Sequence, residues 1–165
     1  MDILKNLNHR LMIDLDSVRI VPGGEEDIEE VIEQSPIQLP EDYLKFLHTI
    51  SGNEKNGIAF LVDQDVDPDS TLTIFIWSAS YSLDKLDELS EAIPEDEFFD
   101  NAWMIGDDVG DFVYYYAEGK EGFGLYRDEA GILCIEKAEK IADSLTDFLV
   151  KGVGIDVALT YPIRK

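Results

Sequence analysis

The sequence predicts an α+β fold, and three observations support this prediction. Apolar residues recur at helical spacing in the first third of the chain and again near its end, whereas the middle contains short runs of aliphatic and aromatic residues. Most of these runs follow one another at intervals of about ten residues, which is typical of an antiparallel meander. The elements come in the order helices, strands, helix, strands, helix, which differs from regular βαβ alternation.

Two amphipathic helices are expected first. After the turn Pro22-Gly23-Gly24, apolar residues recur at helical spacing among acids, at Ile28, Val31 and Ile32. The second helix begins at Leu39-Pro40-Glu41-Asp42, because proline suits the first turn and acids favour the positive end of the helix dipole. It should end at Gly52, and its apolar stripe consists of Tyr43, Phe46, Leu47 and Ile50.

Two strands and a third helix should follow. The runs at residues 58–62 and 72–77 are bounded by Asp, Asn, Ser and Pro, which predicts two strands around an acidic loop. The third helix is expected over residues 83–93, because Leu86, Leu89 and Ile93 share one face and Pro94 would stop it.

The second half of the chain predicts four further strands and a closing helix. The strands are expected at residues 102–105, 112–116, 122–126 and 132–135, between turns rich in Gly, Asp and Glu. Ser144-Leu145-Thr146-Asp147 is similar to a capping box and should open the last helix. We expect a single domain over residues 1–165, with its core at about residues 25–150 and a loosely held tail at residues 152–165.

Acidic residues dominate the charge. The 165 residues include 36 Asp and Glu against 13 Lys and Arg, a formal net charge of -23 at pH 7. Because nucleic acids and anionic membranes attract basic surfaces, neither is expected as a direct partner. No apolar run is long enough for a membrane span and the chain does not open like a signal peptide, so we expect a cytoplasmic protein. The single cysteine, Cys134, has aliphatic neighbours and is expected to be buried and unreactive.

The acidity is concentrated in the body of the chain. Residues 20–119 hold 25 acids and three lysines, a net charge of -22, whereas the two ends together hold 11 acids and 10 bases. Repulsion on this scale destabilises the compact state. The block therefore either keeps the protein soluble or meets a positively charged partner.

One acidic segment suggests a metal site. The alternating acids Asp63, Asp65, Asp67 and Asp69 are similar to the opening of a calcium-binding EF-hand loop. The pattern then fails, because Pro68 stands where glycine is required and Ile74 where a glutamate is required. Zinc is not expected either, because His9 and His48 are far apart in the sequence and one cysteine cannot build a thiolate site. We predict no metal and no cofactor, and leave open weak binding of a divalent ion by this loop.

A second carboxylate cluster lies in the sequence Gly106-Asp107-Asp108-Val109-Gly110-Asp111. Paired carboxylates can perform acid–base catalysis, but glycine and aspartate also suit a tight turn between strands. The sequence contains no nucleophile elbow, phosphate loop or dinucleotide fingerprint, so we predict that the protein is not an enzyme. A carboxylate-dependent hydrolase is the alternative that this cluster leaves open.

Three consecutive tyrosines follow this cluster. Since alternate side chains of a strand face opposite ways, Tyr115 should point away from Tyr114 and Tyr116. We expect about half of these aromatic side chains to be core, and the outward half, next to Asp108 and Asp111, to suit a protein interface.

Three segments resemble the SUKH superfamily. The first is Leu39-Pro40-Glu41-Asp42-Tyr43-Leu44-Lys45-Phe46-Leu47, which ends near Ser51-Gly52-Asn53. The second is Trp103-Met104-Ile105-Gly106-Asp107-Asp108-Val109-Gly110-Asp111-Phe112, which is similar to the strand, Gly-Asp-rich turn and strand of that family. The third and weakest is the terminal helix at residues 144–149. The turn departs from the commoner family form, since it is shorter and has Val109 where glycine is frequent.

The resemblance implies an α+β fold with a central curved, mostly antiparallel sheet flanked by helices, and a binding role. The family includes yeast cell-wall assembly regulators and bacterial immunity proteins that neutralise toxins, many of them nucleases. We therefore predict an immunity protein whose acidic surface binds a cognate, basic toxin. The alternative is a non-catalytic adaptor of the yeast regulator type. The predicted partner-binding residues are Asp63, Asp65, Asp67, Asp69, Asp107, Asp108, Asp111 and Tyr115.

Overall fold

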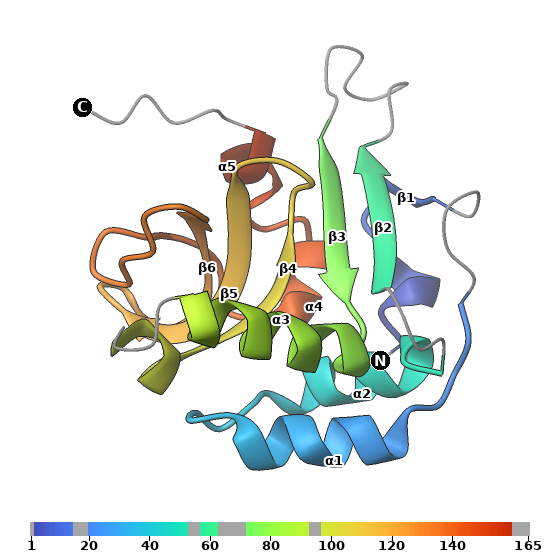
Figure 1. Cartoon of the computed structure of the whole chain (residues 1–165). Coiled ribbons are helices and arrows are strands. Elements are labelled where there is room, and N and C mark those ends of the chain that lie inside the picture. The colour runs from blue at the N-terminus through green and yellow to red at the C-terminus, as the bar shows by residue number, and fades with distance from the viewer. Residues whose placement is uncertain (1, 15–19, 53–56, 63–71, 93–96, 160–165) are drawn as a thin grey trace.

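The computed structural model describes residues 2–14, 20–52, 57–62, 72–92 and 97–159. Within these ranges seven strands form one sheet, and each strand is antiparallel to the next in the sequence. The strands are β1 (Leu11–Ile13), β2 (Gly57–Val62), β3 (Thr73–Trp77), β4 (Ala102–Asp107), β5 (Phe112–Gly119), β6 (Gly122–Glu129) and β7 (Glu139–Ala142). The helices are α1 (Glu25–Gln34), α2 (Glu41–Ile50), α3 (Ala79–Ala92), α4 (Leu145–Leu149) and α5 (Ile155–Leu159), with 3-10 helices η1 (Leu4–Asn6) and η2 (Glu97–Asp100). The predicted α+β class with a curved antiparallel sheet is confirmed (Figure 1).

Two clusters of apolar side chains cover the two faces of the sheet. The larger cluster packs α1, α2, α4 and α5 against one face, which carries Tyr114 and Tyr116. The smaller cluster covers the other face, which carries Tyr115, with side chains from η2 and from the segment after β6. Helix α3 contributes to both, through Leu83 on one side and Leu89 on the other. The predicted opposite orientation of Tyr115 is therefore confirmed.

The first two helices form where the sequence predicts them. In α1, Ile28 and Val31 are buried, but Ile32 is 51% exposed, so its assignment to the apolar face is wrong. In α2 the predicted stripe is buried along its whole length. Gly24 precedes α1 at φ 80°, and a Cβ there would lie 2.5 Å from the carbonyl oxygen of Ser51. Glycine is therefore needed where the start of α1 passes the end of α2.

Helix α4 begins as the capping sequence predicts. The hydroxyl of Ser144 accepts a hydrogen bond from the Asp147 N–H at 3.1 Å. The carboxylate of Asp42, in the first turn of α2, accepts bonds from both the N–H (3.0 Å) and the hydroxyl (2.7 Å) of Thr146. The acid at this position therefore joins two helices that are far apart in the sequence, in addition to favouring the dipole of α2.

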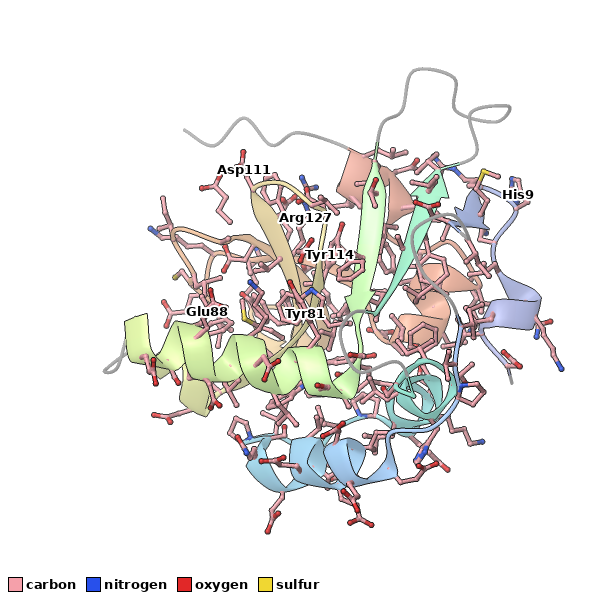
Figure 2. The ribbon with its side chains drawn as sticks, turned by 45° about the vertical axis from the view of Figure 1, so that its right-hand side comes forward. His9, Tyr81, Glu88, Asp111, Tyr114 and Arg127 are labelled. Atoms are coloured by element: carbon pink, nitrogen blue, oxygen red, sulfur yellow. The ribbon has the colours of Figure 1, made fainter. Side chains whose placement is uncertain are left out.

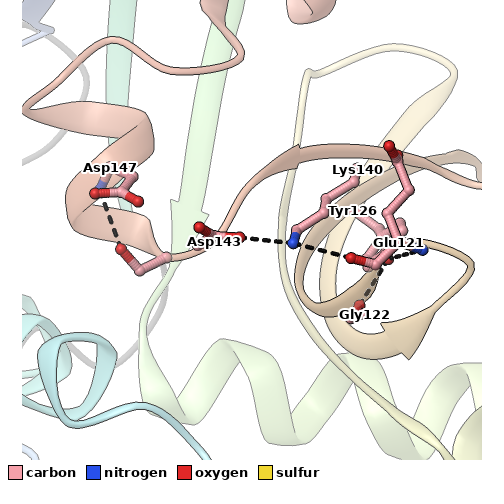
Figure 3. Close-up of polar contacts among 7 residues, drawn as sticks. Glu121, Gly122, Tyr126, Lys140, Asp143 and Asp147 are labelled. Carbon is pink, nitrogen blue, oxygen red and sulfur yellow. Dashed lines mark hydrogen bonds and ion pairs between the residues drawn. The ribbon is translucent and has the colours of Figure 1, made fainter.

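The hairpin between β5 and β6 is fixed by polar contacts (Figure 3). The hydroxyl of Tyr126 donates to the Gly122 carbonyl at 2.7 Å and accepts from the Glu121 N–H at 3.1 Å. Lys140 pairs with Asp143 at 2.6 Å and donates to the Glu121 carbonyl at 3.2 Å. Its bond to Asp143 raises the pKa of Lys140. This hairpin is at the opposite end of β5 from the turn at residues 106–111, which we call the carboxylate turn.

Three parts of the fold differ from the prediction. Residues 132–135 do not form the predicted strand, since Leu133 and Ile135 pack against the smaller cluster without pairing in the sheet, and the last strand is β7. Strand β1 was not predicted, since three residues are too few for a periodic signal. Helix α5 lies within the expected tail, with Ile155 and Ala158 buried, so residues 155–159 are part of the packed structure. Residues 160–165 lie outside the described ranges.

Two smaller expectations also change. Helix α3 begins at Ala79, a full turn earlier than predicted, and Ser78 precedes it with a hydroxyl that accepts from the Tyr81 N–H at 3.2 Å. Cys134 is half-buried, so the expectation of a buried thiol is wrong. None of the helices within the described ranges is both long and apolar enough to cross a membrane.

Candidate partner-binding site

The carboxylate turn joins β4 to β5 and is built by its own side chains. Asp107 Oδ1 accepts a hydrogen bond from the Val109 N–H at 2.7 Å. Asp108 Oδ1 accepts from the N–H groups of Gly110 at 2.8 Å and Phe112 at 3.1 Å. These bonds are the aspartate turns expected of such a sequence. The two carboxylates therefore have a structural role, whether or not they also bind a partner.

Val109 occupies the tip of this turn in an unusual conformation. Its φ is 59°, in the left-handed region, and it is the one non-glycine residue with positive φ among the described residues. A β-branched side chain is rarely found there, and the conformation costs about 1–3 kcal/mol. The side chain is 70% exposed, so packing within the described chain offsets little of that cost. The chain thus keeps valine where glycine would relieve the strain.

A β-bulge determines which face Asp107 occupies. The pairing of β4 with β5 shifts between Met104 and Gly106. Ile105 lies on the larger-cluster face, and unbroken alternation would put Asp107 there as well. Because of the bulge, Asp107 instead pairs with Val113 and faces the smaller cluster. Its Oδ2 there accepts a hydrogen bond of 2.9 Å from Nε1 of Trp77.

A groove of about 520 Å³ runs from α3 over the strands to the carboxylate turn, and its lining includes Phe75, Trp77, Tyr81, Lys85, Asp107 and Val109. Figure 2 shows Tyr81 on α3 and Asp111 at the opposite end of the strands. The ring centroids of Phe75 and Tyr81 are 6.0 Å apart in an edge-to-face arrangement, and those of Trp77 and Tyr81 are 5.5 Å apart. The groove therefore combines partly exposed aromatic rings with one fixed carboxylate.

One exposed aliphatic side chain, Val109, lines this groove, and another, Ile132, follows the lining residue Ala130 by two positions in the sequence. The Ala130 N–H donates to the Asp111 carbonyl at 2.8 Å, which joins the carboxylate turn to the segment after β6. That segment exposes 71% of Ile132, and the turn exposes 70% of Val109. Exposed apolar residues beside a groove with a charged rim are typical of protein interaction sites.

Acidic side chains gather on two neighbouring helices. Helices α1 and α3 pack side by side (Figure 1). The exposed acids on them are Glu25, Glu26, Glu29, Glu30, Glu33, Asp84, Asp87, Glu88 and Glu91. Two acidic runs that are far apart in the sequence thus lie on adjacent helices, and we call these nine exposed acids the α1–α3 acidic face. The sequence showed both runs but could not show that they are adjacent.

Tyr115 is not available on the surface. It is fully buried, and its hydroxyl donates to Asp128 Oδ2 at 2.9 Å. Burial and the neighbouring Asp128 carboxylate raise the pKa of Tyr115. Asp128 also accepts a hydrogen bond from the Cys134 N–H at 2.8 Å. Tyr115 and Asp128 together therefore hold the segment after β6 against the sheet. The expectation of Tyr115 as an exposed anchor is therefore wrong.

The structure brings only part of the predicted site together. Asp107, Asp108 and Asp111 share one turn, with Asp107 and Asp108 half-buried and Asp111 exposed. The predicted residues Asp63, Asp65, Asp67 and Asp69 lie outside the described ranges. The groove and its rim were not predicted, because their members come from α3 and several strands. Within the described ranges no group of three or more His, Cys, Asp or Glu side chains is arranged to hold a metal ion.

These features define an α+β domain whose antiparallel sheet presents an aromatic groove beside a carboxylate-rich turn. The chain belongs to the SMI1 / KNR4 family (SUKH-1), whose family model matches residues 22–151. No individual curated protein matches the chain. The family match covers α1 to α4, and so includes the groove, the carboxylate turn and the α1–α3 acidic face.

Proposed function

We propose that this protein is an immunity protein that binds and neutralises a cognate bacterial toxin domain in the cytoplasm of the cell that makes the toxin. Membership of the SMI1 / KNR4 family supports a binding role, and the net charge of -23 supports a basic partner. Toxins that act on nucleic acid need basic surfaces to bind phosphate. An acidic inhibitor would complement such a surface and prevent it from reaching its substrate.

The α1–α3 acidic face and the groove would serve different steps of binding. Nine exposed acids on two adjacent helices create a negative potential that speeds the encounter with a basic protein. Close contacts would then form at the groove, where exposed Val109 and the rings of Phe75 and Tyr81 can exclude water. In this arrangement the acidic face determines the association rate and the groove determines the dissociation rate.

The first experiment tests the function itself. The chain is co-expressed with the polypeptide encoded immediately upstream of its gene, and the survival of the cells is scored against expression of that polypeptide alone. Rescue by this chain, together with a direct complex of the two purified proteins, is the expected result. If the neighbouring polypeptide is toxic and this chain neither rescues the cells nor binds it, the immunity function is wrong.

The second experiment separates charge from contact. Association rates with the toxin are measured as the salt concentration rises, for the natural chain and for the variant Glu29→Gln, Glu30→Gln, Asp87→Asn and Glu91→Gln. We expect the natural association rate to fall steeply with salt, and the variant to associate more slowly with a weaker salt dependence and a similar dissociation rate. A salt-insensitive association rate would remove the electrostatic part of the proposal.

A second candidate function is a non-catalytic adaptor that binds proteins of its own cell. The matched family is named after SMI1 and KNR4, and this is the observation that favours the alternative. Capture of several host proteins and no toxin, using the full chain as bait in its native cell, would favour the adaptor. Catalysis is not expected, because Asp107 and Asp108 are engaged in building their turn. Loss of a measured hydrolase activity in Asp108→Asn would contradict this expectation.

A further inference from the structure

The groove has a more specific chemistry than a general docking surface. We propose that it is an arginine-binding site, in which the guanidinium of a basic protein partner pairs with Asp107 and lies against the rings of Phe75 and Tyr81. The inference rests on the proposed function only for the identity of the partner. The preference for arginine is argued from the residues of the groove, and it can be tested without the toxin.

The carboxylate of Asp107 is oriented before any ligand arrives. Trp77 Nε1 donates to one of its oxygens at 2.9 Å, and the Val109 N–H donates to the other at 2.7 Å. Each oxygen of an ionised carboxylate can accept two hydrogen bonds, so both can still take part in a bidentate contact. A guanidinium presents parallel N–H groups that match this geometry, whereas an ammonium acts as a point charge.

The aromatic rings favour the same ligand. Phe75 and Tyr81 are both half-buried and line the groove together with Asp107. The face of an aromatic ring attracts cations, and the planar guanidinium can also stack on it. One cation already lies over such a ring, since the Nζ of Lys85 is 5.5 Å from the centroid of Tyr81. The charge of Lys85 is in turn paired with Glu88 at 3.6 Å, which reduces its repulsion of a second cation.

Other classes of ligand fit the groove less well. A phosphate or carboxylate would be repelled by Asp107 and by the neighbouring Asp108 and Asp111. A purely apolar ligand would cover the Asp107 carboxylate without pairing it, which carries a large desolvation penalty. The volume of about 520 Å³ is in the range of side-chain and small-ligand sites. Charge complementarity therefore points to a cationic, planar group supplied by a basic protein.

The two tryptophans allow a direct test by NMR. In the ¹⁵N-labelled full chain, the indole N–H of Trp77 reports on Asp107, whereas that of Trp103 is bonded to Tyr43 on the other face of the sheet. The probe is N-acetyl-arginine amide, and N-acetyl-citrulline amide is the uncharged isostere. Both are titrated at constant ionic strength. The Trp77→Phe variant assigns the two resonances.

We expect arginine to move the Trp77 resonance in a saturable way, with a Kd of about 10–100 mM for the isolated amino acid derivative. Citrulline should bind at least about threefold more weakly, and Trp103 should not move. In Asp107→Asn the preference for arginine over citrulline should disappear. In Phe75→Leu, which keeps the carboxylate, arginine should bind about threefold more weakly.

Three outcomes would overturn the inference: an equal response to arginine and citrulline, an undiminished arginine preference in Asp107→Asn, or no shift of Trp77 at all. An unchanged Trp103 resonance in each variant shows that the variant is folded. If Asp107→Asn does not fold, Phe75→Leu decides the question. Arginine binding without rescue in the co-expression experiment would contradict the immunity function and leave the groove assignment intact. Rescue without arginine binding would support the immunity function and contradict the groove assignment.

Discussion

Trp77 and Asp107 are joined across β3 and β4 by a hydrogen bond of 2.9 Å from the indole Nε1 to the carboxylate Oδ2. The indole is 2% exposed and lies within the smaller apolar cluster, whereas the carboxylate is half-buried at the edge of the groove. The bond thus connects the core of one face to the turn that we propose for partner binding.

Replacing Trp77 by phenylalanine tests the strength of this connection. The Trp77→Phe variant keeps an aromatic ring in the core but removes the donor, and we expect the free energy of unfolding to fall by about 2–4 kcal/mol from lost packing and the lost charged hydrogen bond. Urea unfolding provides the measurement. In the background of Asp107→Ala, where no acceptor is present, the same substitution should cost about 1–2 kcal/mol less. Equal costs in the two backgrounds would show that the bond does not stabilise the fold.

Val109 should contribute to binding at the expense of stability. Because glycine adopts a φ of 59° without strain, Val109→Gly should raise the free energy of unfolding by up to about 2 kcal/mol. Val109→Ala stays strained and should change stability by less than about 0.5 kcal/mol. Both variants should dissociate faster from the toxin, since the exposed side chain is shortened or lost. Unchanged dissociation in Val109→Gly would show that the strained valine is not used for binding.

Neighbouring tyrosines should respond in opposite ways to loss of their hydroxyl groups. The buried hydroxyl of Tyr114 has no hydrogen-bond partner among the described residues, so Tyr114→Phe should leave stability unchanged or raise it by up to about 1 kcal/mol. The hydroxyl of Tyr115 donates to the buried carboxylate of Asp128, so Tyr115→Phe should lower the free energy of unfolding by about 1–3 kcal/mol. Thermal and urea unfolding of the two variants measure this difference. Equal effects would contradict the described hydrogen bonds.

Alkaline pH should unfold the protein in a narrow range. Burial raises the pKa of Tyr43 to about 12, and it also raises the pKa values of Tyr114, Tyr115 and Tyr116. In the unfolded chain these tyrosines ionise near pH 10. Their contribution to stability is therefore complete below pH 10 and is lost as the pH rises toward 12 and above. Between pH 10 and its own raised pKa, each buried tyrosine should lower the free energy of unfolding by about 1.4 kcal/mol per pH unit.

The ultraviolet absorbance of tyrosinate, followed together with circular dichroism, measures this transition. We expect the buried tyrosines to ionise together with the loss of structure. Ionisation of all seven tyrosines near pH 10 with the fold intact would contradict their burial.

Local signals predicted most of the fold. Helix α2 combines a proline, early acids and one apolar stripe within a dozen residues, and its position was correct. The run at residues 132–135 carries an equally local signal for a strand, but the buried Asp128 takes the Cys134 N–H and the Ala138 N–H bonds the Cys134 carbonyl. Hydrogen bonds to Asp128, six residues earlier, and within the following turn therefore override the strand propensity of the run.

The candidate site depended on features that no local pattern contains. The Gly-Asp turn was recognisable because glycine and aspartate are its building residues. The face of Asp107 depends on the bulge at Met104–Gly106, and the groove requires α3 to lie beside β3 and β4. Tyr115 was assigned to the correct face, but η2 covers that face with Phe98, whose ring centroid is 4.7 Å from that of Tyr115. Alternation along a strand identifies a face without showing whether it is covered.

The order of the strands has a consequence for how the chain folds. Each of the seven described strands pairs with its neighbour in the sequence, and short turns join β4 to β5 and β5 to β6, so this part of the sheet can form hairpin by hairpin as the chain leaves the ribosome. Contacts between nearby residues close short loops at low entropic cost and favour rapid folding. The N- and C-terminal segments meet last, where the Asn8 N–H bonds the Leu149 carbonyl at 2.8 Å. The N-terminal segment therefore cannot form this contact until α4 has been synthesised.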